Sequence, residues 1–520
     1  MIQTITEMMA IDELRKEGEL GSIFPISKHE NYSSQSFREL VEKSSSNPNI
    51  SRTRKSITLI DALALVFGTI VGSGIFKGVQ EPYGIFQSHD TAFVMIFWLV
   101  FGTIAIFGGL CYAELGTRIP QSGGDKSYIK EILSEKLSTL FVIFFVFLVK
   151  TLALAALSIT GATYILNIWV DHPDTYMWTL RVMAIVMLFI CLIITCINKK
   201  FAPKTGVVTT ILKTIAILII IGGGLYSMAI GNTVDWNPPF KMVGFDFNQL
   251  GVAMLATFWA YDGANTLGMV AGEMVNPARD LPIAIIIGMG SVVILYALIV
   301  ISYPAIIGYD AVKASTGVAF DCAKKLLGAW APVMSILIFV SAFGSATSTL
   351  FTVSSASVSA GLTGQLPRIF SIVNRKTRTP IFSAFVVFLI ASFMTFLDFN
   401  TILGYISLTG LLFYSITYVA LWVIKIKTKN QPQKGIFRVP YILIIIIQVF
   451  YLFMIGLSFK VQPFGSIIIT LLMLLVLGLQ FIKLPKRNRV VRKISNIQDE
   501  FISCLQRRFG CDLANIQDIE

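Results

Sequence analysis

Apolar residues in this chain of 520 residues occur in long blocks that are separated by short polar segments. Twelve of the blocks are long enough for a helix to cross the ~30 Å hydrocarbon core of a bilayer. An even number of crossings places both termini on the same side of the membrane. The pattern therefore predicts an all-α membrane protein with twelve transmembrane helices, near 57–79, 92–115, 136–168, 179–197, 205–230, 248–271, 283–307, 331–361, 381–397, 401–424, 440–458 and 464–484.

Two of these blocks are interrupted. The sixth contains Trp259-Ala260-Tyr261-Asp262-Gly263-Ala264-Asn265, and the first contains Gly68-Thr69-Ile70-Val71-Gly72-Ser73-Gly74-Ile75-Phe76. A carboxylate near the bilayer midplane costs roughly 2.5–3.5 kcal/mol, so Asp262 is expected to face a cavity, a partner or a substrate. Glycine weakens a helix and frees its backbone groups. Interrupted helices in corresponding halves of a membrane protein indicate the substrate site of a transporter.

Composition and charge support the membrane interpretation. The chain is 55% hydrophobic and 14% charged, with a mean hydropathy of +0.73, whereas soluble domains contain roughly 25% charged residues. The net charge of +12 does not indicate nucleic acid, because Lys and Arg concentrate in alternate loops and no nucleic-acid-binding motif occurs. Basic residues in alternate loops are typical of cytoplasmic connections. We therefore expect an integral membrane protein, in the plasma membrane, with both termini cytoplasmic.

The predicted helices divide the chain into three parts. Residues 1–55 are polar, rich in Ser and Asn and without the apolar core of a signal peptide, which predicts a disordered cytoplasmic tail. Residues 56–484 form the twelve-helix domain. Residues 485–520 form a second cytoplasmic tail.

The interrupted helices offer complementary backbone groups to a ligand. Unwinding at Gly72-Ser73-Gly74 exposes N–H groups at the positive end of a half-helix, which attract a carboxylate. Free carbonyls at Trp259 and Ala260 would accept hydrogen bonds from an ammonium group. Together the two breaks fit a zwitterion. The alternative is that the glycines only allow close helix packing.

The sequence contains no pattern that indicates catalysis or a bound cofactor. Its six cysteines lack the spacing of metal ligands, and neither a catalytic triad nor a phosphate-binding loop occurs within the spans. The three histidines lie outside the spans, which excludes a histidine proton relay within the membrane. We expect no enzymatic activity, no cofactor and no metal.

Several segments resemble a known family. The first interrupted helix, Gly68 to Phe76, looks like the first-helix signature of amino-acid/polyamine/organocation transporters. The segment Leu110-Cys111-Tyr112-Ala113-Glu114-Leu115-Gly116-Thr117, followed by Ser122-Gly123-Gly124, resembles the light subunits of heteromeric amino-acid transporters, the L-type family. The resemblance continues through Glu273 to Pro282, Phe343 to Ser345 and Gly364 to Pro367. It covers about residues 57–484.

This resemblance implies a fold and an activity. The fold is LeuT-like, with two inverted five-helix repeats (about 57–230 and 248–424) and two extra helices (440–484). The activity is sodium-independent exchange of amino acids. The sequence Trp-Ala-Tyr-Asp-Gly is most similar to the branch that handles neutral and dibasic amino acids, in which the aspartate faces a cationic side chain. The implied substrate-binding residues are Ile70, Gly72, Ser73, Gly74, Trp259, Ala260, Asp262 and Asn265.

Two intramembrane lysines have competing interpretations. The resemblance implies that the ammonium of Lys213, on the fifth helix, occupies the place of a sodium ion; the alternative is a lysine that snorkels to the membrane surface. For Lys150 we favour a structural ion pair or a snorkelling position.

The chain also departs from the family pattern. The loop from Trp169 to Trp178 lacks the cysteine that normally forms a disulfide with a glycoprotein heavy chain, so we expect no covalent heavy chain, while a noncovalent one stays open. Ala264 stands where a tryptophan is usual, which predicts a wider pocket. Ser355 replaces a family arginine, and Gly272-Glu273 replaces paired glutamates.

An amino-acid antiporter is the favoured interpretation. The alternatives are a channel-like protein or nutrient-sensing receptor on the same fold, and a transporter restricted to neutral L-amino acids.

Overall fold

The structure is a computed structural model that describes residues 57–72, 74–86, 90–170, 173–197, 201–233, 244–428, 436–481, 502 and 511–514. The predicted tail 1–55 lies outside the described residues. So does the predicted tail 485–520, apart from Ile502 and residues 511–514. The predicted site residue Ser73 also lies outside them.

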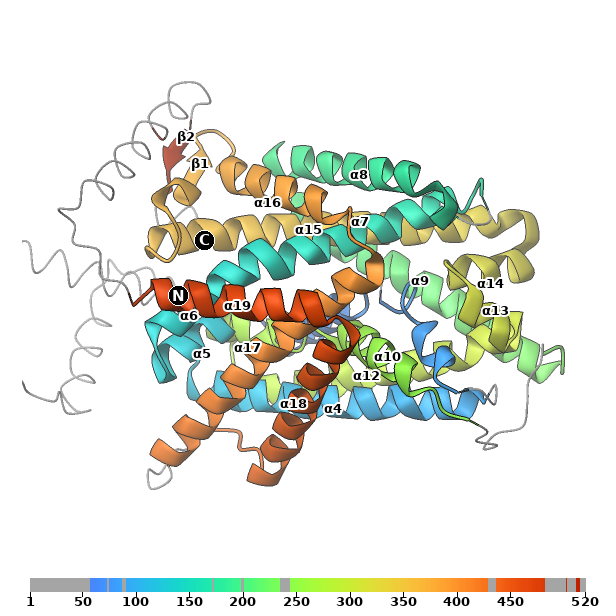
Figure 1. Ribbon diagram of the computed structural model, residues 1–520, viewed down its shortest axis with the longest axis horizontal. Coiled ribbons are helices and arrows are strands. Elements are labelled where there is room, and N and C mark those ends of the chain that lie inside the picture. The colour runs from blue at the N-terminus through green and yellow to red at the C-terminus, as the bar shows by residue number, and fades with distance from the viewer. Residues whose placement is uncertain are drawn as a thin grey trace, which may run out of the picture.

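Helices make up most of the described chain (Figure 1). The first half contains α3 (Leu59–Ile70), α4 (Thr91–Arg118), α5 (Asp125–Ile132), α6 (Glu135–Phe144), α7 (Lys150–Leu166), α8 (Met177–Ile197), α9 (Phe201–Ala229), α10 (Phe247–Tyr261) and α11 (Thr266–Val270). The second half contains α12 (Pro277–Ile307), α13 (Tyr309–Ala314), α14 (Val318–Leu327), α15 (Ala331–Leu362), α16 (Ile381–Met394), α17 (Phe399–Lys427), α18 (Tyr441–Val461) and α19 (Pro463–Leu479). Short turns of helix are η2 (Glu81–Gly84), η3 (Phe145–Val149), η4 (Pro173–Tyr176), η5 (Ala271–Glu273), η6 (Gly328–Trp330) and η7 (Arg368–Ser371).

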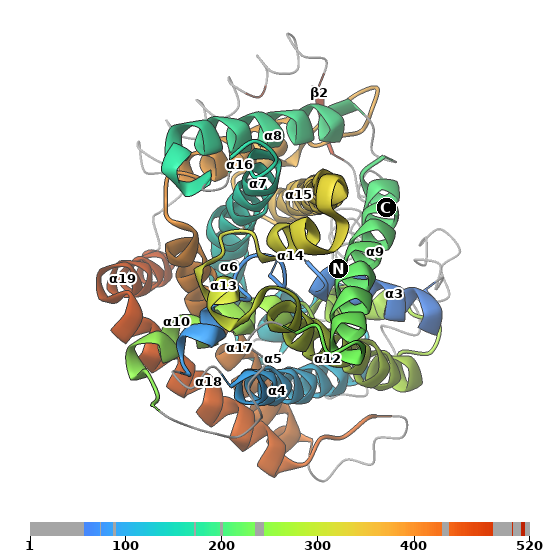
Figure 2. The ribbon, with the colours of Figure 1, turned by 90° about the vertical axis from the view of Figure 1, so that its right-hand side faces the viewer.

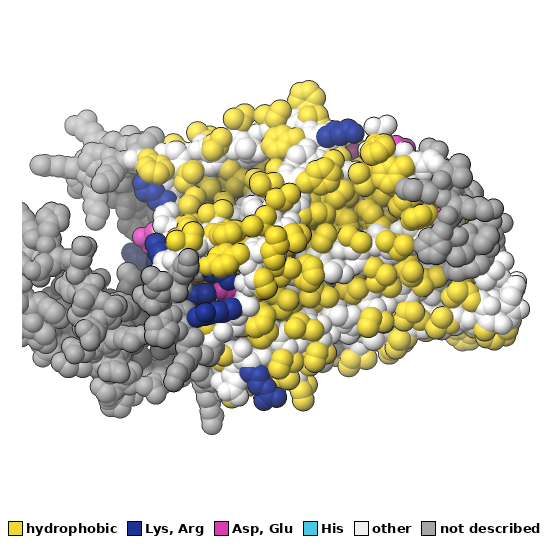
Figure 3. All heavy atoms as spheres, turned by 90° about the horizontal axis from the view of Figure 1, so that it is seen from below, with side chains coloured by type: hydrophobic (Ala, Val, Ile, Leu, Met, Phe, Trp, Pro, Cys, Tyr) yellow, Lys and Arg dark blue, Asp and Glu magenta, His cyan; other side chains and the backbone are white. Residues whose placement is uncertain are grey.

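The helices confirm a helical membrane protein. By length and composition, eight described segments are long and apolar enough to cross a bilayer: Thr91–Arg118, Glu135–Leu166, Met177–Ile197, Val208–Ala229, Pro277–Ile307, Val318–Leu362, Phe399–Lys427 and Tyr441–Val461. The other four predicted spans coincide with shorter helices, α3, α10, α16 and α19. The face shown in Figure 3 is mostly hydrophobic, and its charged side chains lie mainly toward one end. The number of twelve crossings and the inverted repeat stay predictions.

Two groups of helices pack around the interrupted segments. In one group α12 packs against α3, α4 and α9, and in the other α15 packs against α7, α8, α9 and α16. Helix α9 therefore contacts both groups. Figure 2 shows the assembly from the end that carries α13 and α14.

A short antiparallel pair of strands departs from the all-helical expectation. Strand β1 (Ile372–Asn374) pairs with β2 (Cys511–Leu513), with Val373 opposite Asp512. Ala514 N–H also donates to the Ser371 carbonyl at 2.8 Å. Residues 511–514 thus pack against the helical domain at the end opposite α13 and α14 (Figure 1).

Polar side chains fix the ends of several helices. Thr58 and Asp61 form a capping box at the start of α3. Glu114 is completely buried, and its carboxylate pairs with Arg118 at 2.7 Å and with Lys425 at 2.8 Å. It also accepts the Val439 N–H at 2.8 Å. A buried charge requires such partners, so Glu114 holds the ends of α4 and α17 together.

A π-helical turn interrupts the third long span. It is η3, between α6 and α7, and it ends directly before Lys150. Such turns shift the face on which the following residues lie and often occur at functional sites. Lys150 is partly buried, and no salt bridge to its ammonium group occurs among the described residues. Its Nζ lies 5.0 Å from the centre of the Phe145 ring.

Candidate functional site

The two predicted helix breaks are present and face each other. Helix α3 ends at Ile70, and residues 74–80 form turns rather than a regular helix. Helix α10 ends at Tyr261, Asp262 has an extended backbone (φ −68°, ψ 140°), and α11 begins at Thr266. Backbone groups in both segments therefore leave the helical hydrogen-bond pattern inside the hydrophobic core.

Glycines allow the breaks to come into contact. A side-chain carbon added at Gly74 would lie 2.9 Å from Ala260 Cα and 3.3 Å from the Trp259 ring. Gly263 has a φ of +138°, which favours glycine, and a carbon added there would lie 3.1 Å from the side chain of Ile70. The close approach explains why the sequence has glycine at both positions.

Three tyrosine hydroxyls satisfy carbonyls that the breaks release. The Tyr296 hydroxyl donates to Ile70 at 3.0 Å and lies 3.2 Å from the Ala260 carbonyl. Tyr303 donates to Ile75 at 3.2 Å, and Tyr164 donates to Phe76 at 2.7 Å. An unsatisfied backbone group in the membrane would cost several kcal/mol. Tyr296 therefore joins the two breaks through one hydroxyl group.

The carbonyls of Trp259 and Ala260 are not free, which corrects the sequence-based expectation. Trp259 accepts the Asp262 N–H at 3.2 Å, and Ala260 lies within hydrogen-bond distance of the Tyr296 hydroxyl. A carbonyl oxygen has two lone pairs, so each retains one site for a further donor.

Lys213 reaches the first break from α9. It is only 2% exposed, and its Nζ donates to the Gly68 carbonyl at 2.6 Å. The snorkelling alternative is therefore wrong. The ammonium group lies at the C-terminal end of α3, where a positive charge stabilises the helix dipole.

Asp262 and Asn265 face away from α3, toward α4 and α17. The Tyr414 hydroxyl donates to the Asp262 carboxylate. Asn265 donates to Asp125 at 3.3 Å, and Asp125 also accepts from Tyr112 at 2.5 Å and from Thr417 at 2.7 Å. Asp125 was not predicted as a site residue, although the Ser122-Gly123-Gly124 motif stands directly before it.

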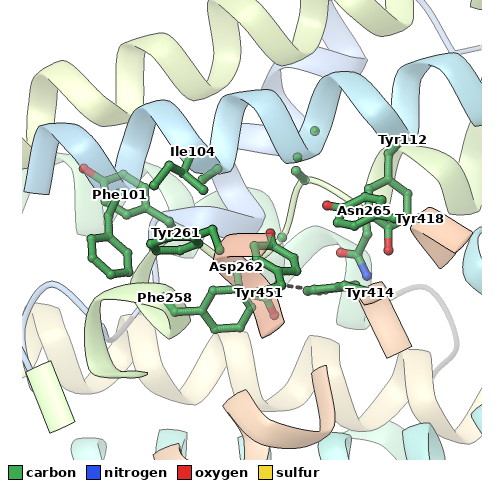
Figure 4. Close-up of a pocket in the computed structure, with 16 residues that line it drawn as sticks. Phe101, Ile104, Tyr112, Phe258, Tyr261, Asp262, Asn265, Tyr414, Tyr418 and Tyr451 are labelled. Carbon is green, nitrogen blue, oxygen red and sulfur yellow. Dashed lines mark hydrogen bonds between the residues drawn. The ribbon is translucent and has the colours of Figure 1, made fainter. Parts of the chain in front are cut away.

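Figure 4 shows the crevice into which Asp262 points. We name it the tyrosine crevice; α4, α10, α17, α18 and the break itself form its walls, and its lining includes Tyr112, Tyr261, Asp262, Tyr414, Tyr418 and Tyr451. Asn265 also lines it. The other described residues predicted to bind substrate do not line the crevice. Ile70, Gly74, Trp259 and Ala260 lie at the contact between the breaks, and Gly72 lies within the first break.

Aromatic side chains of α10 and of the first turn of α17 lie next to each other. The rings of Trp259 and Phe399 meet edge to face at 6.0 Å, and Lys77 Nζ lies 5.1 Å from the centre of the Phe399 ring. Nearby, Asn400 donates to Glu81 at 3.2 Å. Burial raises the pKa of Glu81, while this hydrogen bond acts in the opposite direction.

The sequence is similar to known membrane transport proteins. The sequence model of a family described as amino acid permease matches residues 57–480. The chain is 29% identical to the large neutral amino acids transporter small subunit 2 of Homo sapiens, over 79% of this chain and 77% of that protein. It is 28% identical to the human cystine/glutamate transporter (79% and 82%) and 27% identical to the human b(0,+)-type amino acid transporter 1 (79% and 84%).

Tyr296→Phe tests whether the shared hydroxyl stabilises the two breaks. The substitution leaves two buried carbonyls without this donor, at a cost of about 1–3 kcal/mol. We expect the apparent melting temperature of the purified protein to fall by several degrees. Tyr226→Phe is the matched control, because Tyr226 is 64% exposed on α9. Equal melting temperatures for the two variants would show that the Tyr296 hydroxyl is dispensable.

Proposed function

Since the chain belongs to the amino acid permease family, we propose that it exchanges amino acids across the membrane by alternating access and without sodium. It is an amino-acid transporter and not an enzyme. The contact between the two helix breaks is the observation that carries the proposal. It brings the end of α3 and the end of α10 together within the hydrophobic core, where released backbone groups can hold both ends of a zwitterion.

In this proposal the substrate's carboxylate binds at Ile70, Gly72, Ser73 and Gly74, and its ammonium group binds at the second lone pairs of the Trp259 and Ala260 carbonyls. Trp259 closes over the substrate, and Asp262 and Asn265 face its side chain. Neutral amino acids then need only the backbone groups. Cationic amino acids gain the Asp262 carboxylate as well.

We further propose twelve transmembrane helices in a LeuT-like arrangement, in the plasma membrane, with both termini cytoplasmic. Support comes from the eight apolar spans, the four shorter helices at the remaining predicted positions, and the match to the family over residues 57–480. The two interrupted helices, α3 and α10–α11, occupy the first and sixth of the predicted positions.

Asp262→Asn should selectively reduce uptake of arginine and lysine. The loss of a desolvated charge pair costs on the order of 2–5 kcal/mol, whereas neutral substrates lose no such partner. Uptake of labelled arginine and leucine into proteoliposomes measures the difference. Asp246→Asn at the start of α10 is the control, because asparagine also caps a helix. If leucine and arginine uptake fall together, Asp262 has a structural role only.

Lys213 supplies a fixed charge where other transporters bind sodium, so replacing sodium by choline should leave uptake unchanged. Lys213→Met keeps the side-chain volume but removes the ammonium group that holds the Gly68 carbonyl. We expect turnover to fall at least tenfold. Lys460→Met, at an exposed position on α18, should transport normally. A clear requirement for sodium, or normal turnover in Lys213→Met, would contradict this proposal.

The relatives include a transporter small subunit, so a heavy-chain partner is possible for this protein. We propose that no disulfide joins the two, because the loop from Trp169 to Trp178 contains no cysteine. Cys322 lies in α14 and is completely buried, which leaves it unsuited to an intermolecular link. Non-reducing gels of native membranes should show a single band at the monomer mass. A heavier band that disappears on reduction would mean that another cysteine forms the link.

A further inference from the structure

The segment between α4 and α5 lies against one half of the second interrupted helix. The Gly123 N–H donates to the Met269 carbonyl at 3.0 Å, and the Gly124 N–H donates to the Gly268 carbonyl at 3.1 Å. Both acceptors belong to α11, a helix of five residues. The last carbonyls of a helix have no partner within it, so the segment supplies donors that α11 itself lacks. In the proposed orientation the sixth span runs from outside to inside, so α11 is its cytoplasmic half.

Glycines on both segments make this close approach possible. Gly123 and Gly124 have φ values of +133° and +56°, where a side chain would be strained. On the facing segment, a carbon added at Gly268 would lie 3.4 Å from the Gly124 Cα, and one added at Gly272 would lie 2.7 Å from the Ser122 nitrogen. The two backbones therefore approach each other directly, and a separation of the segments would break the hydrogen bonds between them.

Asp125 follows the two glycines and adds side-chain hydrogen bonds to this contact. It is completely buried. Its Oδ1 accepts from the Tyr112 hydroxyl at 2.5 Å and from the Thr417 hydroxyl at 2.7 Å, and its Oδ2 accepts from the Asn265 Nδ2 at 3.3 Å. Figure 4 shows Tyr112 and Asn265 close together at one end of the crevice. A buried carboxylate is costly without hydrogen bonds, so these three donors hold Asp125 in place.

The contact joins parts of the structure that pack against different helices. Helix α11, directly after Asn265, packs against α3 and α4, whereas α5, which begins at Asp125, packs against α6 and α17. In alternating access, the cytoplasmic half of an interrupted helix separates from its neighbours so that the substrate can leave on that side. The hydrogen bonds between residues 122–125 and the second interrupted helix would then have to break in each cycle.

We propose that residues 122–125 form an inner clamp on the second interrupted helix, and that Asp125 is the positioning residue that closes it. The inference rests on the proposed function, because the clamp acts on one step of the transport cycle. Asp125 does not contact the substrate in this proposal. It holds Asn265 and so fixes the position at which α11 begins. The closed clamp keeps the cytoplasmic side of the site shut, and its opening breaks the Asn265 hydrogen bond together with those of Gly123 and Gly124.

A reversal of the hydrogen bond between Asn265 and Asp125 tests the role of Asp125. Asp125→Asn keeps Oδ1 and both of its donors, but it turns an NH2 group toward the NH2 group of Asn265. Asn265→Asp places two carboxylates against each other. The double variant, Asp125→Asn with Asn265→Asp, restores one donor and one acceptor, with the direction of the bond reversed.

The first measurement is amide hydrogen exchange of Gly123 and Gly124 in the purified full chain in lipid nanodiscs. Loss of a hydrogen bond to a charged group should raise their rate of hydrogen exchange about tenfold or more in each single variant. The double variant should return this rate to within about threefold of the unmodified protein, because the bond is present again. The amides of residues 80–86, on the outer side in the proposed orientation, should keep their rates in all variants.

The second measurement is counterflow of labelled leucine in proteoliposomes. Asp125→Asn should lower the maximum rate about tenfold or more, because fewer molecules reach the state that is closed on the inner side. Thr417→Val removes one donor to Oδ1, so it should raise hydrogen exchange at Gly123 and Gly124 and slow counterflow. Thr409→Val is the matched control: Thr409 is also completely buried on α17, and its hydroxyl donates to the Tyr405 carbonyl of the same helix.

The possible outcomes separate the two proposals. Unchanged hydrogen exchange at Gly123 and Gly124 in Asp125→Asn overturns the clamp, even where leucine counterflow is slow. The clamp is also overturned if the double variant exchanges its amide hydrogens as fast as the single variants, because Asp125 would then act through something other than Asn265. An absence of leucine counterflow in the unmodified protein contradicts the proposed function, while the hydrogen exchange rates still decide whether Asp125 holds α11.

Discussion

The direct contact between the two helix breaks is the constraint on which the rest of the structure depends. Two segments of the chain leave the helical hydrogen-bond pattern next to each other within the hydrophobic core, where no water replaces the lost bonds. The Tyr296 hydroxyl serves both of them, since it lies within hydrogen-bond distance of Ile70 and Ala260. Helix α12, which carries Tyr296, packs against α3, and its Tyr296 side chain also reaches Ala260 near the end of α10. The close approach of the breaks requires that Gly74 and Gly263 stay small.

Buried charges follow the same principle. Glu114 lies in the hydrophobic domain because Lys425, Arg118 and the Val439 N–H together satisfy its carboxylate. Among the described residues Lys213 has no carboxylate partner, and it donates instead to the Gly68 carbonyl near the end of α3. A lysine that is tethered covalently to α9 cannot leave with each transport cycle, as a bound ion does. This distinction gives a physical reason why a protein with such a residue would exchange substrates without a coupling ion.

The sequence predicted the breaks but not the residues that complete them. A carboxylate inside an apolar block is exceptional, so Asp262 was visible from hydropathy alone, and the close succession of Gly68, Gly72 and Gly74 indicated the first break. Tyr296 and Tyr414 were not, because a tyrosine in an apolar span is common and its partner lies 226 or 152 residues away in the sequence. The seven-residue spacing of Tyr296 and Tyr303 was the available signal, since it places both hydroxyl groups on one face of α12. The pairing of β1 with β2 depends on three residues per strand, too few for a periodic pattern.

The two sides of the second break have different chemistry, and this difference bears on selectivity. The side toward α3 offers backbone groups, and in the proposed function these bind the carboxylate and ammonium groups that all amino acids share. The side toward α4, α17 and α18 offers a carboxylate and aromatic rings, and in the proposed function these face the side chain of the substrate. Larger side chains at Gly74 or Gly263 would push the two breaks apart, so these positions must stay small. Ala264 and Ala105 line the crevice and do not form the contact with α3, so other side chains fit at these two positions without separating the breaks. In the proposed function, substitutions in the crevice therefore change the substrate range while the contact between the breaks stays the same.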